Sequence, residues 1–417
     1  MSSKRPSEWT FKEIVEDGTN WAEYQRAYAD EVTADQVKEV EKMLGCGDPS
    51  CGFATYVCLD CGQEKRVAFS CKSRVCSSCG KVHADEWAEQ LSSRLWHVTH
   101  RHVTFTLPAE LWPLLEVHES WRKELLGAAD ATLKAVMKNQ AGMVVTLHPY
   151  GKDLKVNYHL HVLVTEGGMD DAGKWQPQSY LDYKSLRRVW QYEVLTRLRA
   201  VMPESLEYKR LINELFSRYA NGFYVYAEPK VKDGQGIGRY IGRYLRHPAI
   251  ADSRIVAYDG EAVTFRYDER VKGGKVRREQ TLPVLAFMHG VIRHIPPKQF
   301  KMVRYYGLYA PRKKAAVKQL MKQIGTMLGR AVRRLSWRGR RLRDFHQDPL
   351  TCAACGATDM VLFSLTLPWA GRMITLGGWS WLFARGDLVE TSPQPPATPV
   401  DPAPSSFQLT FDFPVAA

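Results

Sequence analysis

Two histidines separated by a single leucine lie in a segment with strand character. They are His159 and His161, and the segment covers residues 158–165. Because side chains alternate across a β-strand, both imidazoles are expected on one face of the strand. Two imidazoles at this spacing can share a divalent ion, although histidines with a purely structural role show the same spacing. A metal site would need a third ligand, for which His148 is the first candidate and Glu228 the second.

Two tyrosines, Tyr240 and Tyr244, occur in a segment that is expected to be helical from about Ile237 to His247. A spacing of four residues places both phenols on the same face of a helix, one turn apart. A phenol with a pKa of about 10 is a weak nucleophile, but it can attack a phosphorus that a metal ion polarises. An amphipathic helix with two aromatic core positions has the same pattern. Three flanking arginines would suit a phosphate: Arg239, Arg243 and Arg246.

The nine cysteines occur mostly as C-x-x-C pairs, which in a chain without a secretory signal indicate metal binding rather than disulfides. Two pairs are separated by fourteen residues, so that four thiolates can converge on one structural Zn²⁺: Cys58, Cys61, Cys76 and Cys79. Unmetallated buried thiols are the alternative.

A second zinc site is also conceivable near this first set of cysteines. Its candidate ligands are Cys46, Cys51, Cys71 and His83. Alternatively, Cys71 replaces one member of the first set. A last pair, Cys352 and Cys355, has the spacing of half a zinc ribbon, and no partner for it is evident from the sequence.

The hydrophobic pattern that must position these residues alternates between helices and strands, which predicts an α+β fold. Helices are expected at 9–45, 84–96, 110–139, 182–200 and 204–219, and strands at 101–107, 142–148, 159–165, 222–227 and within 254–281. A chain of 417 residues with 45% hydrophobic residues can bury a substantial core, so disorder throughout is excluded.

The net charge of +13 indicates a polyanionic partner, most often nucleic acid. No acidic residue occurs between Glu279 and Asp344, whereas sixteen Lys or Arg lie between Arg293 and Arg343. The rest of the chain has 42 basic and 45 acidic residues, so the whole surplus lies in this acid-free segment. We expect a phosphate-binding surface that includes Arg333, Arg334, Arg338, Arg340 and Arg341.

Other features bear on where the chain acts. No apolar stretch follows the basic residues at the start, so no secretory signal is visible, and the protein is expected to be intracellular. The most apolar window, 360–384, contains a proline and glycines and fits two short strands better than a membrane span. The tail from Thr391 contains seven prolines and is expected to be disordered.

Taken together, these blocks resemble the two-tyrosine rolling-circle transposases of the insertion-sequence-91 family, within the HUH endonuclease superfamily. The resemblance covers roughly residues 40–360. It is carried by Ser70–Cys76, His102–Pro108, Leu147–Gly151, the His159/His161 strand with Gly167 and Gly168 behind it, Arg239–Ile250 and Arg304–Leu308. The chain departs from the family at Ser77 and Ala353, where proline is common inside the C-x-x-C pairs.

The resemblance implies a metal-dependent enzyme that cleaves and rejoins single-stranded DNA at the ends of a mobile element and at its target. His159 and His161 would hold Mg²⁺ or Mn²⁺ against the scissile phosphate. Tyr240 or Tyr244 would attack, leaving a 5′-phosphotyrosine and a free 3′-hydroxyl, and the second tyrosine would allow donor and target to be cleaved in turn. A bacterial cytoplasmic protein associated with the nucleoid and without a membrane segment is implied.

The expected organisation has six parts. They are an N-terminal helical segment (1–45), a zinc-binding DNA-recognition module (46–96), an HUH nuclease domain with an antiparallel sheet (97–282), a basic helical DNA-binding region (283–345), a small C-x-x-C module (346–390) and the tail (391–417). Two alternatives stay open: a plasmid replication initiator or relaxase with the same chemistry, and a non-enzymatic zinc-dependent DNA-binding protein.

Overall fold

The computed structural model of the chain describes residues 9–178, 180–227, 248–271, 274–313, 317–318, 320–321, 335–368 and 371–375. The chain divides into two compact units, each assembled from segments that are distant in sequence. The larger unit consists of Met1–Val37 and His83–Val332, and the smaller unit of Lys38–Val82 and Arg333–Ala417.

An antiparallel sheet forms the centre of the larger unit. Its strands follow the order β11-β4-β5-β3-β7, and β6 pairs with β5. The strands are β3 (His100–Thr106), β4 (Gln140–Tyr150), β5 (Val156–Met169), β6 (Trp175–Pro177), β7 (Val225–Ala227) and β11 (Val303–Gly307). Long strands β4 and β5 therefore lie at the middle of the sheet, where both have neighbours.

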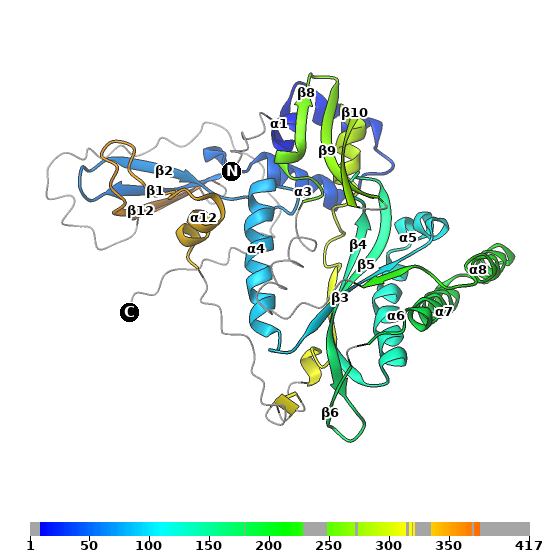
Figure 1. Ribbon diagram of the computed structural model, residues 1–417. Helices are drawn as coiled ribbons and strands as arrows, with labels where there is room; N and C mark the ends of the chain where they lie inside the picture. Colours follow the sequence, from blue (N-terminus) through cyan, green and yellow to red (C-terminus); the bar gives the residue numbers. More distant parts are fainter. Residues whose placement is uncertain are drawn as a thin grey trace. The chain divides into compact units, whose positions relative to one another are not determined.

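Helices cover one face of this sheet and bury the main core (Figure 1). They are α5 (Trp112–Val117), α6 (Glu119–Met137), α7 (Tyr183–Val201) and α8 (Leu206–Arg218), preceded by a 3-10 turn at Ala109–Leu111. Helix α7 begins where the Asp182 carboxylate accepts a hydrogen bond from the Lys184 amide, a typical N-cap. Its buried residues Leu186, Trp190 and Val194 recur every four positions and face the sheet.

The opposite face of the sheet has a different composition. Leu91 of α4 (Ser77–Arg94), together with Leu95, packs there against Val144 and Leu163. Further along the same face, threonine and histidine side chains replace the apolar ones. This polar area carries the candidate metal site described below.

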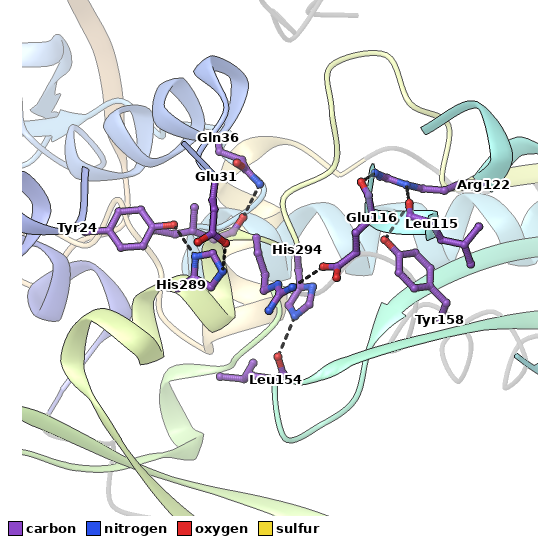
Figure 2. Close-up of polar contacts among 12 residues, drawn as sticks. Tyr24, Glu31, Gln36, Leu115, Glu116, Arg122, Leu154, Tyr158, His289 and His294 are labelled. Atoms are coloured by element: carbon purple, nitrogen blue, oxygen red, sulfur yellow. Dashed lines mark hydrogen bonds and ion pairs between the residues drawn. The ribbon is translucent and has the colours of Figure 1, made fainter. Parts of the chain in front are cut away.

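A second, three-stranded sheet in the larger unit has the order β10-β9-β8. It consists of β8 (Ile255–Tyr258), β9 (Ala262–Val271) and β10 (Gly274–Pro283), and it contacts α10 (Val284–Ile292), α1 (Phe11–Glu16) and α2 (Asn20–Ala27) through residues such as Phe287. Figure 2 shows His289 of α10 between Tyr24 and Glu31, with Tyr24 Oη 3.4 Å from His289 Nδ1. In the same view His294 Nε2 donates to the Leu154 carbonyl at 3.0 Å.

The smaller unit contains a four-stranded antiparallel sheet of order β13-β12-β1-β2. Its strands are β1 (Phe53–Cys58), β2 (Glu64–Ala68), β12 (Met360–Leu367) and β13 (Arg372–Thr375), and its C-terminal helix is α12 (Trp337–Phe345). Helix α3 (Ala34–Leu44) leads into this unit, and short 3-10 turns lie at Pro49–Cys51 here and at Asp252–Arg254 and Pro311–Lys313 in the larger unit.

The mixed helical and antiparallel-sheet class agrees with the expectation, but several details differ. The helix expected over 9–45 is divided into α1, α2 and α3. The zinc-binding module and the C-terminal C-x-x-C module, expected as separate domains, share one sheet because β1 pairs with β12. The basic region 283–345, expected to be helical, includes β11, whose residues pair with β4. The helix expected over 110–139 is interrupted at His118 between α5 and α6.

The tyrosine helix expected at 237–247 and the tail expected from residue 391 fall outside the residues that the structure describes. Among the helices that are described, none combines the length and the apolar character that crossing a membrane would require.

Candidate functional site

Three histidines converge on the polar face of the large sheet. His159 and His161 alternate with Leu160 along β5, and Leu160 is fully buried in the core on the other side. His148, on β4, is the register partner of His159. One nitrogen atom from each of the three imidazoles lies within 4.8 Å of the others, so the three side chains can hold a single ion.

The three imidazole rings lie close to one another. The ring centroids are 4.9 Å apart for His159 and His161, 5.3 Å for His148 and His159, and 5.1 Å for His148 and His161. All three ring pairs are steeply inclined to one another, at 76° to 89°. The rings therefore do not stack, and the arrangement leaves space for an ion between their edges.

The hydrogen bond of His159 fixes which of its nitrogens can bind a metal. His159 Nδ1 lies 2.7 Å from the carbonyl oxygen of Asn157. A carbonyl only accepts, so Nδ1 must carry the proton and donate it. The Nε2 atom of His159 therefore keeps an unprotonated lone pair, which is the form that a metal ligand requires.

A fourth histidine orients His161 from the neighbouring strand. His102 Nε2 is 2.9 Å from His161 Nδ1, and Thr104 Oγ1 is 3.4 Å from the same nitrogen. His102 is only 3% exposed, which fixes its position. Metal-binding imidazoles usually have such a partner on the nitrogen that does not bind the metal.

Burial favours the uncharged form of His159 and His161. The pKa of His161 lies well below its ordinary value because burial disfavours the charged ring and the nearby His148 and His159 add repulsion. Burial also lowers the pKa of His159, against the opposing effect of its hydrogen bond to Asn157. Neutral imidazole is the metal-binding form, so the cluster fits a divalent cation.

The structure thus brings His148, the first candidate for the third position, together with His159 and His161. Glu228, the second candidate, lies outside the described residues. The same holds for the expected nucleophiles and their arginines: Tyr240, Tyr244, Arg239, Arg243 and Arg246. The sequence reasoning missed His102, although His100, His102, Thr104 and Thr106 alternate along one strand and this polar alternation was a readable signal.

Four cysteines of the smaller unit form one cluster: Cys46, Cys71, Cys76 and Cys79. The sulfur of Cys79 lies 3.7 Å from that of Cys46 and 3.6 Å from that of Cys71, and the sulfurs of Cys46 and Cys76 are 3.7 Å apart. Four thiolates each about 2.3 Å from one zinc ion would place their sulfurs about 3.8 Å apart, so the spacing fits zinc. The Ser73 amide donates to the Cys71 sulfur at 3.3 Å, as is common for a metal-bound thiolate.

A separate cluster contains the remaining C-x-x-C pairs, Cys58/Cys61 and Cys352/Cys355. The pairing expected from spacing, in which Cys58 and Cys61 join Cys76 and Cys79, is therefore corrected. Strand β1 pairs with the distant β12, which brings the C-terminal pair to Cys58 and Cys61, whereas Cys76 and Cys79 lie next to Cys46 and Cys71.

Two other candidate zinc ligands belong to neither cluster. Cys51 is exposed, and His83 lies on α4; both are within the described residues.

In the second cluster, backbone N–H groups of Cys355 and Ala354 are directed at the Cys352 sulfur. They lower the pKa of that thiol to about 7, which favours the thiolate.

Basic residues line a groove of about 960 Å³ in the larger unit, beside strand β11. Seven of the lining residues are Lys or Arg and two are acidic, and Phe300, Tyr305 and Tyr306 add aromatic rings. Five of the seven belong to the acid-free segment. The seven are Lys123, Lys134, Lys298, Lys301, Arg304, Arg312 and Lys313. Cationic side chains interleaved with aromatic rings are typical of surfaces that bind single-stranded nucleic acid.

The arginines of α12 have internal partners. Arg338 donates to both carboxylate oxygens of Asp348, at 2.6–3.0 Å, and to the Thr358 carbonyl. Arg341 donates to Ser78 Oγ and lies over the Phe345 ring. Arg340 also lies in α12, whereas Arg333 and Arg334 lie outside the described residues. The charge of Arg338 is therefore neutralised within the smaller unit.

Comparison with known proteins gives two matching family models. A "Putative transposase" model matches residues 142–316, which include His148, His159 and His161. A "Transposase zinc-binding domain" model matches residues 18–107, which include the first cysteine cluster.

Two curated relatives match most of the chain. The transposase for insertion sequence element IS801 from Pseudomonas savastanoi pv. phaseolicola is 31% identical over 347 residues, covering 77% of this chain and 82% of the relative. The putative transposase y4qJ from Sinorhizobium fredii (strain NBRC 101917 / NGR234) is 26% identical over 343 residues, covering 77% and 85%. No solved structure matches the chain.

Proposed function

Since this chain belongs to the IS91 family of transposases, we propose that it moves DNA by the rolling-circle route, cleaving and rejoining single strands through a 5′-phosphotyrosine. The observation that carries this proposal is the convergence of His148, His159 and His161 on one face of an antiparallel sheet. In this proposal, that arrangement would be the metal-binding half of an HUH-type nuclease site. The assignment of Tyr240 and Tyr244 as nucleophiles rests on the sequence pattern and the family resemblance.

The roles of the residues follow from their chemistry. A divalent ion held by the three imidazoles would polarise the scissile phosphate. His102 contacts His161 Nδ1 and would keep His161 in an orientation suited to binding the ion. The phenol oxygen of Tyr240 or Tyr244 forms the new bond to phosphorus and gives up its proton. The bond from phosphorus to the 3′ oxygen breaks, and that oxygen takes up one proton to balance the proton lost by the phenol, which leaves a free 3′-hydroxyl on the departing strand.

The donor set also bears on which ion is used. Three imidazole nitrogens suit transition metals better than Mg²⁺, which prefers oxygen ligands. Of the two ions expected, Mn²⁺ therefore fits the His148–His159–His161 set better than Mg²⁺. The basic groove beside β11 supports binding of the DNA strand, and the cysteine clusters support a zinc-dependent module for recognising it.

A strand-transfer assay tests the proposal against its alternatives. The protein is incubated with Mn²⁺, a single-stranded oligonucleotide carrying the element end and a labelled target oligonucleotide. A transposase produces a joined donor–target strand. A replication initiator or relaxase produces cleavage and religation of its own site without transfer to the target. A non-enzymatic DNA-binding protein shifts the oligonucleotide without producing any cleaved or joined strand.

A further inference from the structure

Two turns of the smaller unit have the same construction although they lie almost 300 residues apart. In the first, the Gly62 amide donates to the Cys58 carbonyl at 2.9 Å, and in the second the Gly356 amide donates to the Cys352 carbonyl at 3.0 Å. Both glycines have φ of about +75°, at +75° and +74°. Each turn thus leads the chain back after a C-x-x-C pair, as zinc knuckles do.

A second hydrogen bond closes each turn at its base. The Cys58 amide donates to the Gln63 carbonyl at 3.0 Å, and the Cys352 amide donates to the Ala357 carbonyl at 2.7 Å. The left-handed conformation explains the glycines, since a Cβ at either Gly62 or Gly356 would be strained by the backbone. The two turns are therefore matching halves of one site.

Strand pairing holds the two turns face to face. Cys58 is the register partner of Met360 where β1 meets β12, and the Leu59 amide donates to the Asp359 carbonyl at 3.0 Å. The sulfur of Cys58 lies 3.6 Å from that of Cys355, and the sulfur of Cys61 lies 3.6 Å from that of Cys352. A disulfide would bring sulfurs to about 2.05 Å, whereas a shared zinc ion would hold them about 3.8 Å apart.

Two of the four cysteines are buried and the other two are exposed. Cys58 and Cys352 are buried in a small core with Leu350 and Met360, against which Trp337 of α12 packs. Cys61 and Cys355 are exposed. The site is thus closed by protein on one side and reachable by ions on the other.

We propose that Cys58, Cys61, Cys352 and Cys355 bind a second structural Zn²⁺ in a ribbon-type site, which fastens the C-terminal segment 335–375 to the N-terminal zinc-binding module. The matching family zinc-binding model ends at residue 107 and does not include Cys352 or Cys355. Because one ligand pair lies near each end of the described chain, the smaller unit is completed only after residue 355 has been synthesised. This inference is independent of the proposed DNA chemistry.

Native mass spectrometry of the full-length protein counts the bound zinc. The Cys352→Ser/Cys355→Ser variant should carry one zinc ion fewer than the wild type, while Cys51→Ser, which removes an exposed cysteine outside both clusters, should carry as many as the wild type. The proposal is overturned if the double variant carries as many zinc ions as the wild type. It is also overturned if the wild type contains Cys58–Cys355 and Cys61–Cys352 disulfides, or an iron cluster at these cysteines.

A ligand exchange gives a readout that does not depend on losing the metal. Co²⁺ in both sites should give the absorption spectrum of tetrahedral tetrathiolate cobalt. Cys355→His keeps four ligands in its site but replaces one sulfur ligand with a nitrogen. Part of the absorption spectrum should therefore shift to shorter wavelength, while two Co²⁺ ions remain bound. An unchanged spectrum in Cys355→His would contradict the assignment.

Discussion

His148 lies directly opposite His159 across the β4–β5 pair, so that residues eleven positions apart in the sequence face one another at a ring distance of 5.3 Å. The pairing adds a third imidazole to the two that alternate along β5. It depends on backbone hydrogen bonds in the middle of the sheet and on the buried residues Leu147 and Leu160, which anchor the two strands in the core. The three side chains are therefore held in place before any ion binds, which favours metal affinity.

Removing the third imidazole tests this arrangement. His148→Ala should weaken Mn²⁺ binding by about 100-fold, because one of three protein ligands is lost from a preformed site. Isothermal titration with Mn²⁺ measures the dissociation constant. His97→Ala removes an exposed histidine outside the cluster and should bind Mn²⁺ like the wild type. Equal affinities of His148→Ala and the wild type would remove His148 from the metal site.

His102 should act on the metal through His161 and not by touching the DNA. His102→Ala is expected to raise the Mn²⁺ concentration needed for half-maximal DNA cleavage by about 10–100-fold, with the rate recovering at saturating Mn²⁺. His102→Gln retains a hydrogen-bonding group toward His161 Nδ1. The Mn²⁺ concentration that it needs for half-maximal cleavage should lie between those of the wild type and His102→Ala. A lower rate that saturating Mn²⁺ fails to restore would indicate a merely structural or a directly catalytic role instead.

The buried His100 predicts sensitivity of the fold to acid. Burial lowers its pKa to about 4, and its Nε2 lies 2.7 Å from Tyr309 Oη. Its pKa in the unfolded chain is about 6.5, so below that pH the unfolded state takes up a proton that the folded state excludes. The free energy of unfolding should therefore be fully retained above pH 6.5 and fall as the pH decreases towards 4.

Urea unfolding at pH 7.5 and pH 5.0 measures this effect of His100. The contribution is about 1.4 kcal/mol per pH unit below 6.5, or about 2 kcal/mol by pH 5.0. His100→Gln is neutral at both values and should lose about that much less stability than the wild type over the same interval. Identical losses in both proteins would show that His100 does not titrate as its burial requires.

The groove beside β11 should account for part of the salt dependence of DNA binding. Replacing Lys301, Arg312 and Lys313 with glutamine should reduce the slope of log affinity against log salt by about 2, since each phosphate contact on single strands contributes about 0.7. Fluorescence anisotropy with a single-stranded oligonucleotide across a salt series provides the slope. Arg338→Gln is the matched control, because Asp348 already neutralises that charge, and its slope should not change. If the slope falls in Arg338→Gln and stays unchanged in the triple variant of the groove, the DNA lies along α12 and not in the groove.

Local periodicity was sufficient to predict the strand that carries His159 and His161. The alternation around Leu160 placed His159 and His161 on one face, and the motif at His148 lay on an adjacent expected strand. His102 was not recognised as part of the site because its contact with His161 joins two different strands, β3 and β5, that are paired in the sheet. Such contacts depend on strand register, which a single sequence specifies only through long-range pairing.

The cysteine pairing was wrong for the same physical reason. Spacing alone favours joining Cys58 with Cys76, because they are near in sequence, while the true neighbour of Cys58 is Cys355. Only the β1–β12 pairing brings that residue close. The basic region 283–345 was likewise expected to be helical, although Val303, Tyr305 and Tyr306 have the β-branched and aromatic character of an edge strand.

The central claim, covalent cleavage of DNA by a tyrosine, is tested most directly by locating the adduct. Wild-type protein is incubated with Mn²⁺ and a single-stranded element end, digested, and analysed by mass spectrometry. We expect the 5′ end of the cleaved strand attached to Tyr240 or Tyr244, with each single phenylalanine variant retaining an adduct on the other tyrosine and Tyr240→Phe/Tyr244→Phe giving none. An adduct that persists in the double variant, or cleavage without any adduct, would contradict the account.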